Sequence, residues 1–319
     1  MLPLGVQLET LCASAQHELV LVAPFIKVSA LGRLLAQIER GVQIRCVTRW
    51  RPDEIIAGVS DLETWLLIQG QDNASLWLRP DLHAKYYRAD ERCLVGSANV
   101  TNKALGWSQQ PNLELLVPMK SDFGELAVFE QQLFAGSVQV DNSIYEQMCA
   151  LGELFAGQRP VPVFDVQDTE DTSADELEQV PIVPVDAWLP MLRYPEHLYI
   201  AYCGDWDKLA EASRVAAQAD LTALQVTPEL SKEAFEIYVG ALLLQMPIIQ
   251  QVDKYVAKPR RFGAVRDLLA SLPCANTPDF DASRAWQTLM RWMGHFLPQR
   301  YKVETPGYSE VFSRKVICD

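Results

Sequence analysis

The sequence predicts an α/β domain over residues 1–156, built as a mixed sheet flanked by helices, and a smaller, mostly helical domain over residues 188–319. Short apolar runs rich in β-forming residues alternate with amphipathic runs in the first 135 residues, as they do in layered α/β folds. Beyond residue 188 the apolar positions follow helical spacing instead. The length of 319 residues accommodates two domains of ordinary size.

In the first domain each element follows from a local pattern. LGRLLAQIER, at residues 31–40, has its apolar positions on one helical face, and Gly41 is suited to end that helix. The strands 83–89 and 92–98 are separated only by a turn at Asp90 and Glu91, which predicts a hairpin. The other expected helices are 3–16, 53–69 and 123–134, and the other expected strands are 17–26, 42–50, 75–79 and 112–119.

Residues 157–187 separate the two domains as an acidic, proline-rich segment. They hold eight acidic residues, four prolines and a single basic residue, Arg159, a composition typical of a mobile linker. The segment accounts for most of the net charge of −13, so this charge does not exclude a phosphate substrate, although it argues against strong non-specific binding to DNA. Two roles stay open for the segment: a solvated linker, or an autoinhibitory plug that competes with an anionic substrate.

The second domain is expected to contain helices at 205–218, 231–257, 260–272 and 281–297. Asp205 and Asp281 precede two of these helices as N-caps. Pro247 should kink or split the longest of them, because proline removes a helical hydrogen bond and clashes with the preceding turn.

The stretch from His83 to Glu114 carries residues suited to cleaving a phosphodiester. Without a metal ion, this reaction needs a nucleophile without formal charge, a proton donor for the leaving oxygen and cations near the phosphate oxygens. Neutral imidazole supplies the nucleophile, and imidazolium supplies the proton donor. His83 and Lys85 lie two residues apart on one predicted strand, so both side chains project from the same face and bring nucleophile and phosphate clamp together.

Four further residues complete the candidate catalytic set. Asn99, in the turn after the next strand, can donate its amide to a phosphate oxygen. Glu114 can accept from the far ring nitrogen of His83 and stabilise the imidazolium. Ser97 either shapes the turn or touches phosphate, and Asp90 either serves catalysis or holds the hairpin turn.

Basic residues outside this stretch are candidate substrate contacts. Arg49 follows a predicted strand on its carboxyl side, where the sites of α/β folds tend to lie. In the second domain Lys258, Arg260 and Arg261 come close together, and they either contact DNA phosphates or form a solvated helix end. No metal or cofactor is expected, because the four histidines and seven cysteines are scattered and no phosphate-binding glycine loop occurs.

The candidate residues match a known signature. His-x-Lys-x4-Asp at 83–90, Gly-Ser-x-Asn at 96–99 and the downstream Glu114 resemble the HKD motif of the phospholipase D superfamily, and the runs LVAPFI and VTRW extend the resemblance over residues 15–135. The resemblance implies a phospholipase D-like sheet and a two-step reaction. One histidine attacks phosphorus to form a phosphohistidine, and a second histidine protonates the leaving group and then activates water.

The chain carries one copy of this motif. His197 and His295 are not followed by a lysine two residues later. The resemblance therefore implies a homodimer in which two His83 side chains share one site, an arrangement that suits a twofold interface.

The function expected from the resemblance is cleavage of nucleic acid. Short, soluble members with one motif resemble bacterial nucleases and restriction or phage-defence components. We therefore expect a cytoplasmic, metal-independent endonuclease that prefers DNA to RNA, with a helical domain that binds the target or other subunits of a defence system. No signal peptide or long apolar run indicates a membrane. Two alternatives stay open: a lipid phosphodiesterase of the phospholipase D type, and a non-catalytic dimerisation subunit of a defence complex.

Overall fold

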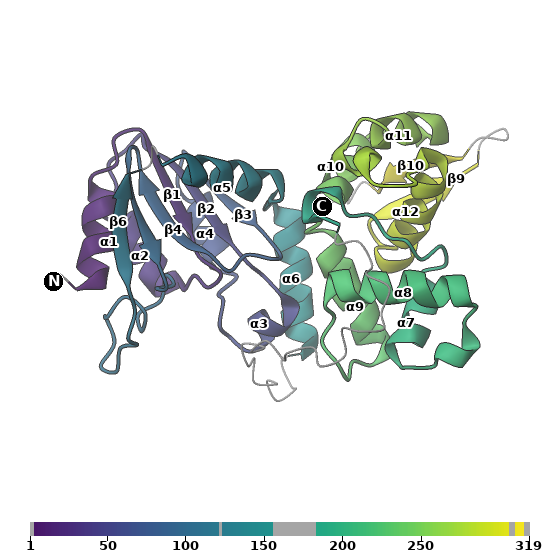
Figure 1. Ribbon diagram of the computed structural model, residues 1–319, viewed down its shortest axis with the longest axis horizontal. Helices are drawn as coiled ribbons and strands as arrows, with labels where there is room; N and C mark the ends of the chain where they lie inside the picture. The colour runs from purple at the N-terminus through teal and green to yellow at the C-terminus, as the bar shows by residue number, and fades with distance from the viewer. Residues whose placement is uncertain (1–2, 121–122, 156–182, 306–309, 316–319) are drawn as a thin grey trace. The chain divides into compact units, whose positions relative to one another are not determined.

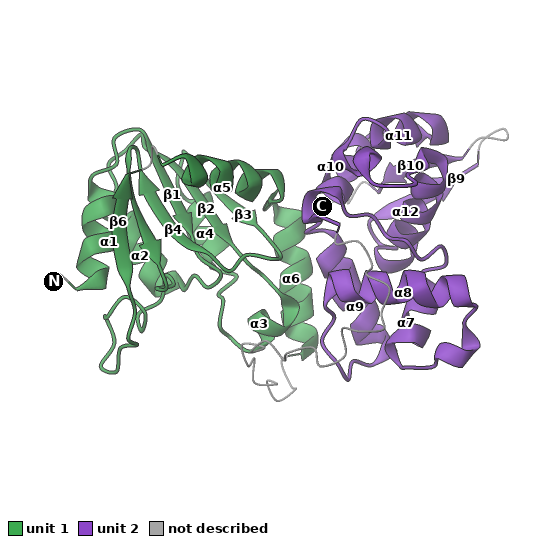
Figure 2. Cartoon of the chain, viewed as in Figure 1, with its two compact units in different colours: residues 1–163 green, residues 164–319 purple. Residues whose placement is uncertain are grey.

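The computed structural model describes residues 3–120, 123–155, 183–305 and 310–315, and the chain divides into two compact units, residues 1–163 and 164–319 (Figure 2). The expected acidic linker, 157–187, lies outside the described residues except at its end. There Val185–Ala187 form a short 3-10 helix, η1.

Unit 1 is built on a seven-stranded mixed sheet in the order β6-β5-β4-β1-β2-β3-β7, which confirms the predicted mixed sheet (Figure 1). β1, β2 and β3 run parallel, and the other neighbouring pairs are antiparallel, including the predicted hairpin of β4 and β5. The strands are β1 Glu18–Val22, β2 Gln43–Thr48, β3 Ala74–Leu78, β4 Lys85–Ala89, β5 Arg92–Gly96, β6 Leu116–Lys120 and β7 Val138–Gln139.

The helices of unit 1 differ from the expected ones at three places, one of which is the helix Asn142–Phe155, which the sequence pattern did not predict. The expected helix 53–69 is two helices, because Gly58 adopts a φ of +68° between them. The expected helix 31–40 ends at Leu35, and Gly41, with a φ of +93°, serves the turn into β2 instead. The helices are α1 Leu4–Ala13, α2 Val28–Leu35, α3 Pro52–Ile56, α4 Thr64–Gln69, α5 Gly124–Ala135 and α6 Asn142–Phe155.

The central strands are buried on both faces of the sheet. Every residue of β1 after Glu18 is buried, as expected for a strand with helices on both sides. Val20 and Val22 pack in an apolar cluster with Leu133 of α5. Tyr87 of β4 points to the other face, where α1 packs against β4 and β5, and is fully buried.

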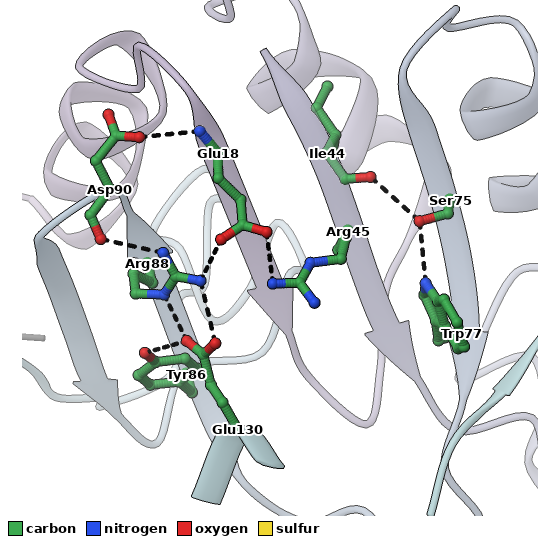
Figure 3. Close-up of polar contacts among 9 residues, drawn as sticks. All are labelled: Glu18, Ile44, Arg45, Ser75, Trp77, Tyr86, Arg88, Asp90 and Glu130. Atoms are coloured by element: carbon green, nitrogen blue, oxygen red, sulfur yellow. Dashed lines mark hydrogen bonds and ion pairs between the residues drawn. The ribbon is translucent and has the colours of Figure 1, made fainter. Parts of the chain in front are cut away.

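Ion pairs tie α5 to the sheet (Figure 3). Arg88 of β4 donates to Glu130 of α5 and to Glu18 of β1, each at 2.5 Å, and Arg45 of β2 pairs with Glu18 at 2.5 Å. Tyr86 donates to Glu130 at 2.7 Å. None of the four charged side chains is more than 25% exposed, so the network fixes the position of α5 over three neighbouring strands.

Unit 2 is mostly helical, as expected, but also contains a three-stranded sheet that the sequence pattern did not reveal. Its strands, in the order β8-β10-β9, pair antiparallel. They are β8 Arg260–Arg261, β9 Tyr301–Glu304 and β10 Val311–Arg314. The helices are α7 Glu196–Tyr202, α8 Glu211–Leu224, α9 Lys232–Leu243, α10 Pro247–Tyr255, α11 Phe262–Leu269 and α12 Ala282–Phe296, with short 3-10 helices η2 Trp206–Lys208 and η3 Pro273–Asn276.

The predicted helix caps and break in unit 2 have mixed outcomes. Pro247 splits the long helix into α9 and α10, which meet at 82°. Asp281 caps α12 by accepting from Arg284 N at 2.7 Å. The expected cap at Asp205 is wrong: it precedes only η2, makes no capping bond and pairs with Lys208 instead. Because η2 takes up the first residues of the expected helix, α8 begins at Glu211.

No single helix in the described part of the chain is long and apolar enough to cross a membrane. α9 and α10 reach such a length and composition only as a bent pair. Residues 241–250, which join them, are buried within unit 2.

Candidate active site

The sheet brings the ends of five strands to one edge of unit 1. Lys85, at the start of β4, pairs with Gly96, at the end of β5, and Gly96 pairs with Leu116, at the start of β6. β4 also lies antiparallel to β1, so it starts where β1 ends, and β2 ends beside β1 because the two are parallel. Residues just before β4 and β6 and just after β1, β2 and β5 therefore meet at one edge, here called the site edge.

His83 and Lys85 lie together at the site edge. Lys85 is the first residue of β4, and His83 lies two residues before it and is exposed. His83 is therefore outside the strand that the sequence pattern predicted to carry both residues. The Lys85 ammonium donates to the backbone carbonyl of His83 at 2.8 Å. This bond places a positive charge beside the main chain of His83 and restrains the backbone that carries the imidazole. The predicted pairing of nucleophile and phosphate clamp stays a prediction.

Gly96 allows β5 and β6 to approach closely at the site edge. A Cβ at this position would lie 1.9 Å from the carbonyl oxygen of Leu115. The next residue, Ser97, bonds the same neighbour in both directions: its N–H donates to Leu115 O at 2.9 Å, and its Oγ accepts from Leu115 N at 3.0 Å. Glycine is therefore required here by a close backbone approach rather than by a positive φ.

The Glu114 carboxylate is held at the site edge by two side chains. Ser97 Oγ donates to one oxygen at 2.5 Å, and Asn112 Nδ2 donates to the other at 3.2 Å. Ser97 thus fixes Glu114, which is a role that the sequence did not suggest. A contact of its hydroxyl with phosphate stays a prediction. Because each carboxylate oxygen accepts more than one bond, the expected bond from the His83 ring stays a prediction.

Asn99 follows β5 and is anchored by its side-chain oxygen. Phe25 N donates to Asn99 Oδ1 at 3.3 Å, and the next residue, Val100, bridges to Ile26. The oxygen of the amide is therefore used by the backbone that follows β1. Its NH₂ group is the part that can donate to a phosphate oxygen, as predicted.

Asp90 is not brought together with these residues. It lies beyond the far end of β4, about 16 Å of strand from Lys85 at ~3.3 Å per residue. Its carboxylate accepts from the backbone N–H groups of Gln16, His17 and Glu18 at 2.7, 3.0 and 2.9 Å (Figure 3 shows the bond to Glu18). Partial burial raises the pKa of Asp90, but these three bonds outweigh it and hold the pKa below its ordinary value. The geometry gives Asp90 the structural role.

Arg49 reaches the site edge, but its guanidinium is engaged by protein groups. It forms a two-point ion pair with Glu54 of α3 and donates to the backbone carbonyl of Leu82 at 2.9 Å. Glu54 is 1% exposed; burial raises the pKa of its carboxyl group, and Arg49 opposes that rise. Lys258, Arg260 and Arg261 lie in unit 2, where Arg260 bonds the carbonyl of Tyr255 and stacks on its ring.

Sequence reasoning missed two residues of the site. Asn112, two residues before Glu114, holds one of its oxygens. Glu54, five residues after Arg49 at the start of a predicted helix, occupies the guanidinium. Their short spacing from Glu114 and Arg49 was the available signal. No group of three or more His, Cys, Asp or Glu side chains is arranged to hold a metal ion among the residues that the structure describes.

Comparison with known proteins agrees with the sequence motif. A family model described as cardiolipin synthase, PLD-like domain, matches residues 8–134. No curated protein matches the chain significantly.

Several solved structures resemble the chain weakly. NucT from Helicobacter pylori is 16% identical, over 46% of this chain and 86% of that one, with a TM-score of 0.31. Nuc from Salmonella typhimurium, a phospholipase D family member, is 18% identical, over 43% and 90%, with a TM-score of 0.34. Phosphatidylserine synthase from Haemophilus influenzae is 15% identical, over 49% and 42%, with a TM-score of 0.37.

The family assignment therefore rests on the sequence match and on the motif, not on these low structural scores. The match over residues 8–134 contains the whole motif. The motif residues before β4, after β5 and before β6 meet at one edge of a mixed sheet. Residues 8–134 of this chain therefore form a domain of the phospholipase D superfamily.

Proposed function

We propose that the protein is a phosphodiesterase that cleaves nucleic acid, DNA in preference to RNA, through a phosphohistidine formed on His83. The observation that carries this proposal is the site edge itself. The residues at this edge offer an exposed imidazole, the ammonium of Lys85, the amide of Asn99 and the carboxylate of Glu114, from the ends of three neighbouring strands. Together they offer a nucleophile, phosphate-oxygen donors and a group that stabilises imidazolium.

The reaction balances without a redox partner. A neutral nitrogen of His83 attacks phosphorus, the P–N bond forms and the bond to the leaving oxygen breaks, with a second imidazolium giving that oxygen a proton. The second imidazole, now neutral, takes a proton from water, which attacks phosphorus and releases His83. Lys85 and Asn99 offset the charge on the phosphate oxygens in both steps.

We propose that the second imidazole is His83 of another copy of the chain. Among the described residues of unit 1, the other histidine is His17, whose backbone N–H bonds Asp90 at the edge of the sheet opposite to His83. If two copies share one site, activity in mixtures of wild type and His83→Ala at constant total protein falls with the square of the wild-type fraction, to about one quarter at an equal mixture. A linear fall would contradict the shared site.

Leu113 and Leu115 flank Glu114 and are exposed to 101% and 53%, so they are positions at which a contact between copies can be probed. Replacing either by glutamate should lower both the solution mass and the activity if a second copy packs beside Glu114. Unchanged mass with full activity would place any contact between copies elsewhere.

The activity is tested with purified protein in EDTA against labelled single- and double-stranded DNA and RNA, with His83→Ala as the control. Cleavage that survives chelation and disappears in the variant supports a metal-independent nuclease. Loss of cleavage in EDTA, with recovery on adding Mg²⁺ or Mn²⁺, would refute metal independence.

A second candidate function is lipid head-group transfer or hydrolysis, which the description of the matching family model favours. Turnover of phosphatidylglycerol or phosphatidylcholine vesicles, with every nucleic acid left intact, would establish it in place of the nuclease. If neither class of substrate is turned over, a non-catalytic role as a dimerisation subunit becomes the better account.

We further propose that the nuclease acts in the cytoplasm within a phage-defence or restriction system, where unit 2 binds the target or other subunits. This proposal is supported by the resemblance to small, single-motif family members. Expression of the wild type, and not of His83→Ala, should then lower the plating efficiency of phage. Equal plating for the two would contradict it.

A further inference from the structure

The buried ion pair of Arg49 and Glu54 holds the main chain just before His83, at Leu82. Arg49 follows β2, and Glu54 belongs to α3, so the pair comes from a segment about thirty residues before the histidine. Arg49 Nε and Nη2 bond the two carboxylate oxygens of Glu54, and Nη1 donates to Leu82 O at 2.9 Å. Each of the three guanidinium nitrogens therefore donates a hydrogen bond, and Nη1 donates to Leu82, the residue before His83.

Burying the charges of Arg49 and Glu54 costs free energy unless both side chains are hydrogen-bonded. The side chain of Glu54 is 2% exposed and that of Arg49 is 15% exposed. Taking both charges out of water is offset only by good hydrogen bonding. Three of the five N–H groups of Arg49 are used, two on the Glu54 carboxylate and one on the Leu82 carbonyl. Leu82 itself is 4% exposed, so its carbonyl also needs a donor from the protein.

Two consecutive carbonyl groups in this segment are held by cationic side chains. Arg49 donates to the carbonyl of Leu82, and Lys85 donates to the carbonyl of His83. The segment has no strand pairing of its own, because β4 begins only at Lys85. Side chains thus supply the restraint that a sheet ladder supplies elsewhere.

We propose that Arg49 and Glu54 are positioning residues: they act through Leu82 to fix the approach of His83 to phosphorus, and they do not bind substrate. This inference rests on the proposed role of His83 as nucleophile. It replaces the expectation that Arg49 contacts phosphate, because its three nitrogens are already directed at Glu54 and Leu82.

Positioning and substrate binding have different kinetic signatures. A shift of the reacting atom by ~1 Å costs on the order of 100-fold in rate. Loss of the Arg49–Glu54 pair that holds Leu82, here called the strut, should therefore lower kcat and leave substrate binding intact. Loss of a direct phosphate contact weakens binding instead, and reduces the salt dependence of binding by roughly 0.7 in the log–log slope for a single strand.

The test compares Arg49→Lys, Glu54→Gln and the double variant Arg49→Met/Glu54→Gln with the matched control Arg79→Lys. Arg79 also pairs at two points with a carboxylate, that of Asp81, and donates to a backbone carbonyl, but its carbonyl belongs to Gln132 in α5. The neutral double variant avoids leaving one buried charge alone, so it keeps the test informative if a single variant fails to fold.

Three readouts are taken from the full chain. Steady-state rates use bis(p-nitrophenyl) phosphate, a diester without base or lipid. Affinity and its salt slope use a labelled DNA oligonucleotide in a His83→Ala background. Hydrogen exchange at the amides of residues 82–86 reports the segment directly and needs no catalysis.

We expect kcat to fall about 10- to 100-fold in the variants of Arg49 and Glu54, with the affinity for DNA and its salt slope unchanged. Hydrogen exchange at residues 82–86 should be faster than in the wild type. The double variant should lose no more kcat than the single variants. Arg79→Lys should keep wild-type kcat and exchange. Wild-type kcat and exchange in the strut variants, or a loss confined to affinity and salt slope, would overturn the proposal. If the wild type hydrolyses no diester, the proposed function fails separately, and exchange still decides whether the strut orders the segment.

Discussion

Replacing Asp90 separates a structural from a catalytic role for the third residue of the motif. Its carboxylate binds three successive backbone N–H groups at the start of β1, and its own φ is +50°, in the left-handed region. Hydrogen bonds to a charged group contribute ~1.5–3 kcal/mol each. Because the three share one partly exposed carboxylate, we expect Asp90→Ala to lower the free energy of unfolding by about 2–4 kcal/mol.

Asp90→Asn is the sharper variant, because asparagine tolerates the left-handed conformation and keeps one acceptor oxygen. The pKa of Asp90 is lowered by folding, so the ionised carboxylate stabilises the fold above about pH 4, and this contribution is lost as the pH falls through the folded pKa. The free energy of unfolding of Asp90→Asn should therefore be lower than that of the wild type at neutral pH. The difference should shrink in acid.

The assay is urea unfolding from pH 3 to pH 7, together with kcat measured where each variant is folded. A structural Asp90 predicts reduced stability with kcat within about twofold of the wild type, since it lies about 16 Å of strand from Lys85. Wild-type stability with kcat reduced 100-fold or more would refute the reasoning and make Asp90 part of the catalytic set.

Three further changes test other parts of the account. Gly96→Ala puts a Cβ 1.9 Å from Leu115 O, so it should separate β5 from β6. We expect the free energy of unfolding in urea to fall by about 1–3 kcal/mol and kcat to fall by a larger proportion. A kcat equal to that of the wild type would contradict the close approach of the two strands. Burial raises the pKa of Asp220 in unit 2 to about 7, against the lowering effect of the Met191 and Leu192 N–H groups. The ionised carboxylate of Asp220 therefore opposes folding. As the pH rises from about 4 to about 7, the free energy of unfolding of Asp220→Asn, measured by thermal unfolding, should increase relative to that of the wild type by up to about 1.4 kcal/mol per pH unit. A difference between the two proteins that does not depend on pH would contradict this. Asp253 is 1% exposed and binds Arg300, Tyr301 and Arg314, so Asp253→Ala should destabilise unit 2 by about 3–5 kcal/mol in calorimetry, and a loss below 1 kcal/mol would show that the cluster contributes little.

The sequence located the site because its residues are tied to local patterns. Lys85 at the start of β4, with His83 just before it, and Asn99 and Glu114 near neighbouring strand ends are placed by the hairpin and by the next antiparallel strand. Period-two alternation and turn residues are sufficient to predict this arrangement.

What the sequence could not show depends on contacts distant along the chain. The partners of Asp90 lie 72 to 74 residues before it, and no local pattern links them. Arg49 looks available for substrate until the fold brings the backbone carbonyl of Leu82, 33 residues later in the chain, to its guanidinium. In unit 2 the sheet of β8, β9 and β10 was missed because its strands are two to four residues long, and because β8 pairs with β10 across some fifty residues.

In the proposed reaction His83 becomes covalently attached to phosphorus. The most direct measurement is rapid quenching of the protein with a short labelled DNA under alkaline conditions, where phosphohistidine persists, followed by peptide mass spectrometry. The account predicts a phosphate-linked DNA fragment on the peptide that contains His83, absent in His83→Ala and decaying as product appears. Rapid cleavage with no adduct, or an adduct on another residue, would contradict it.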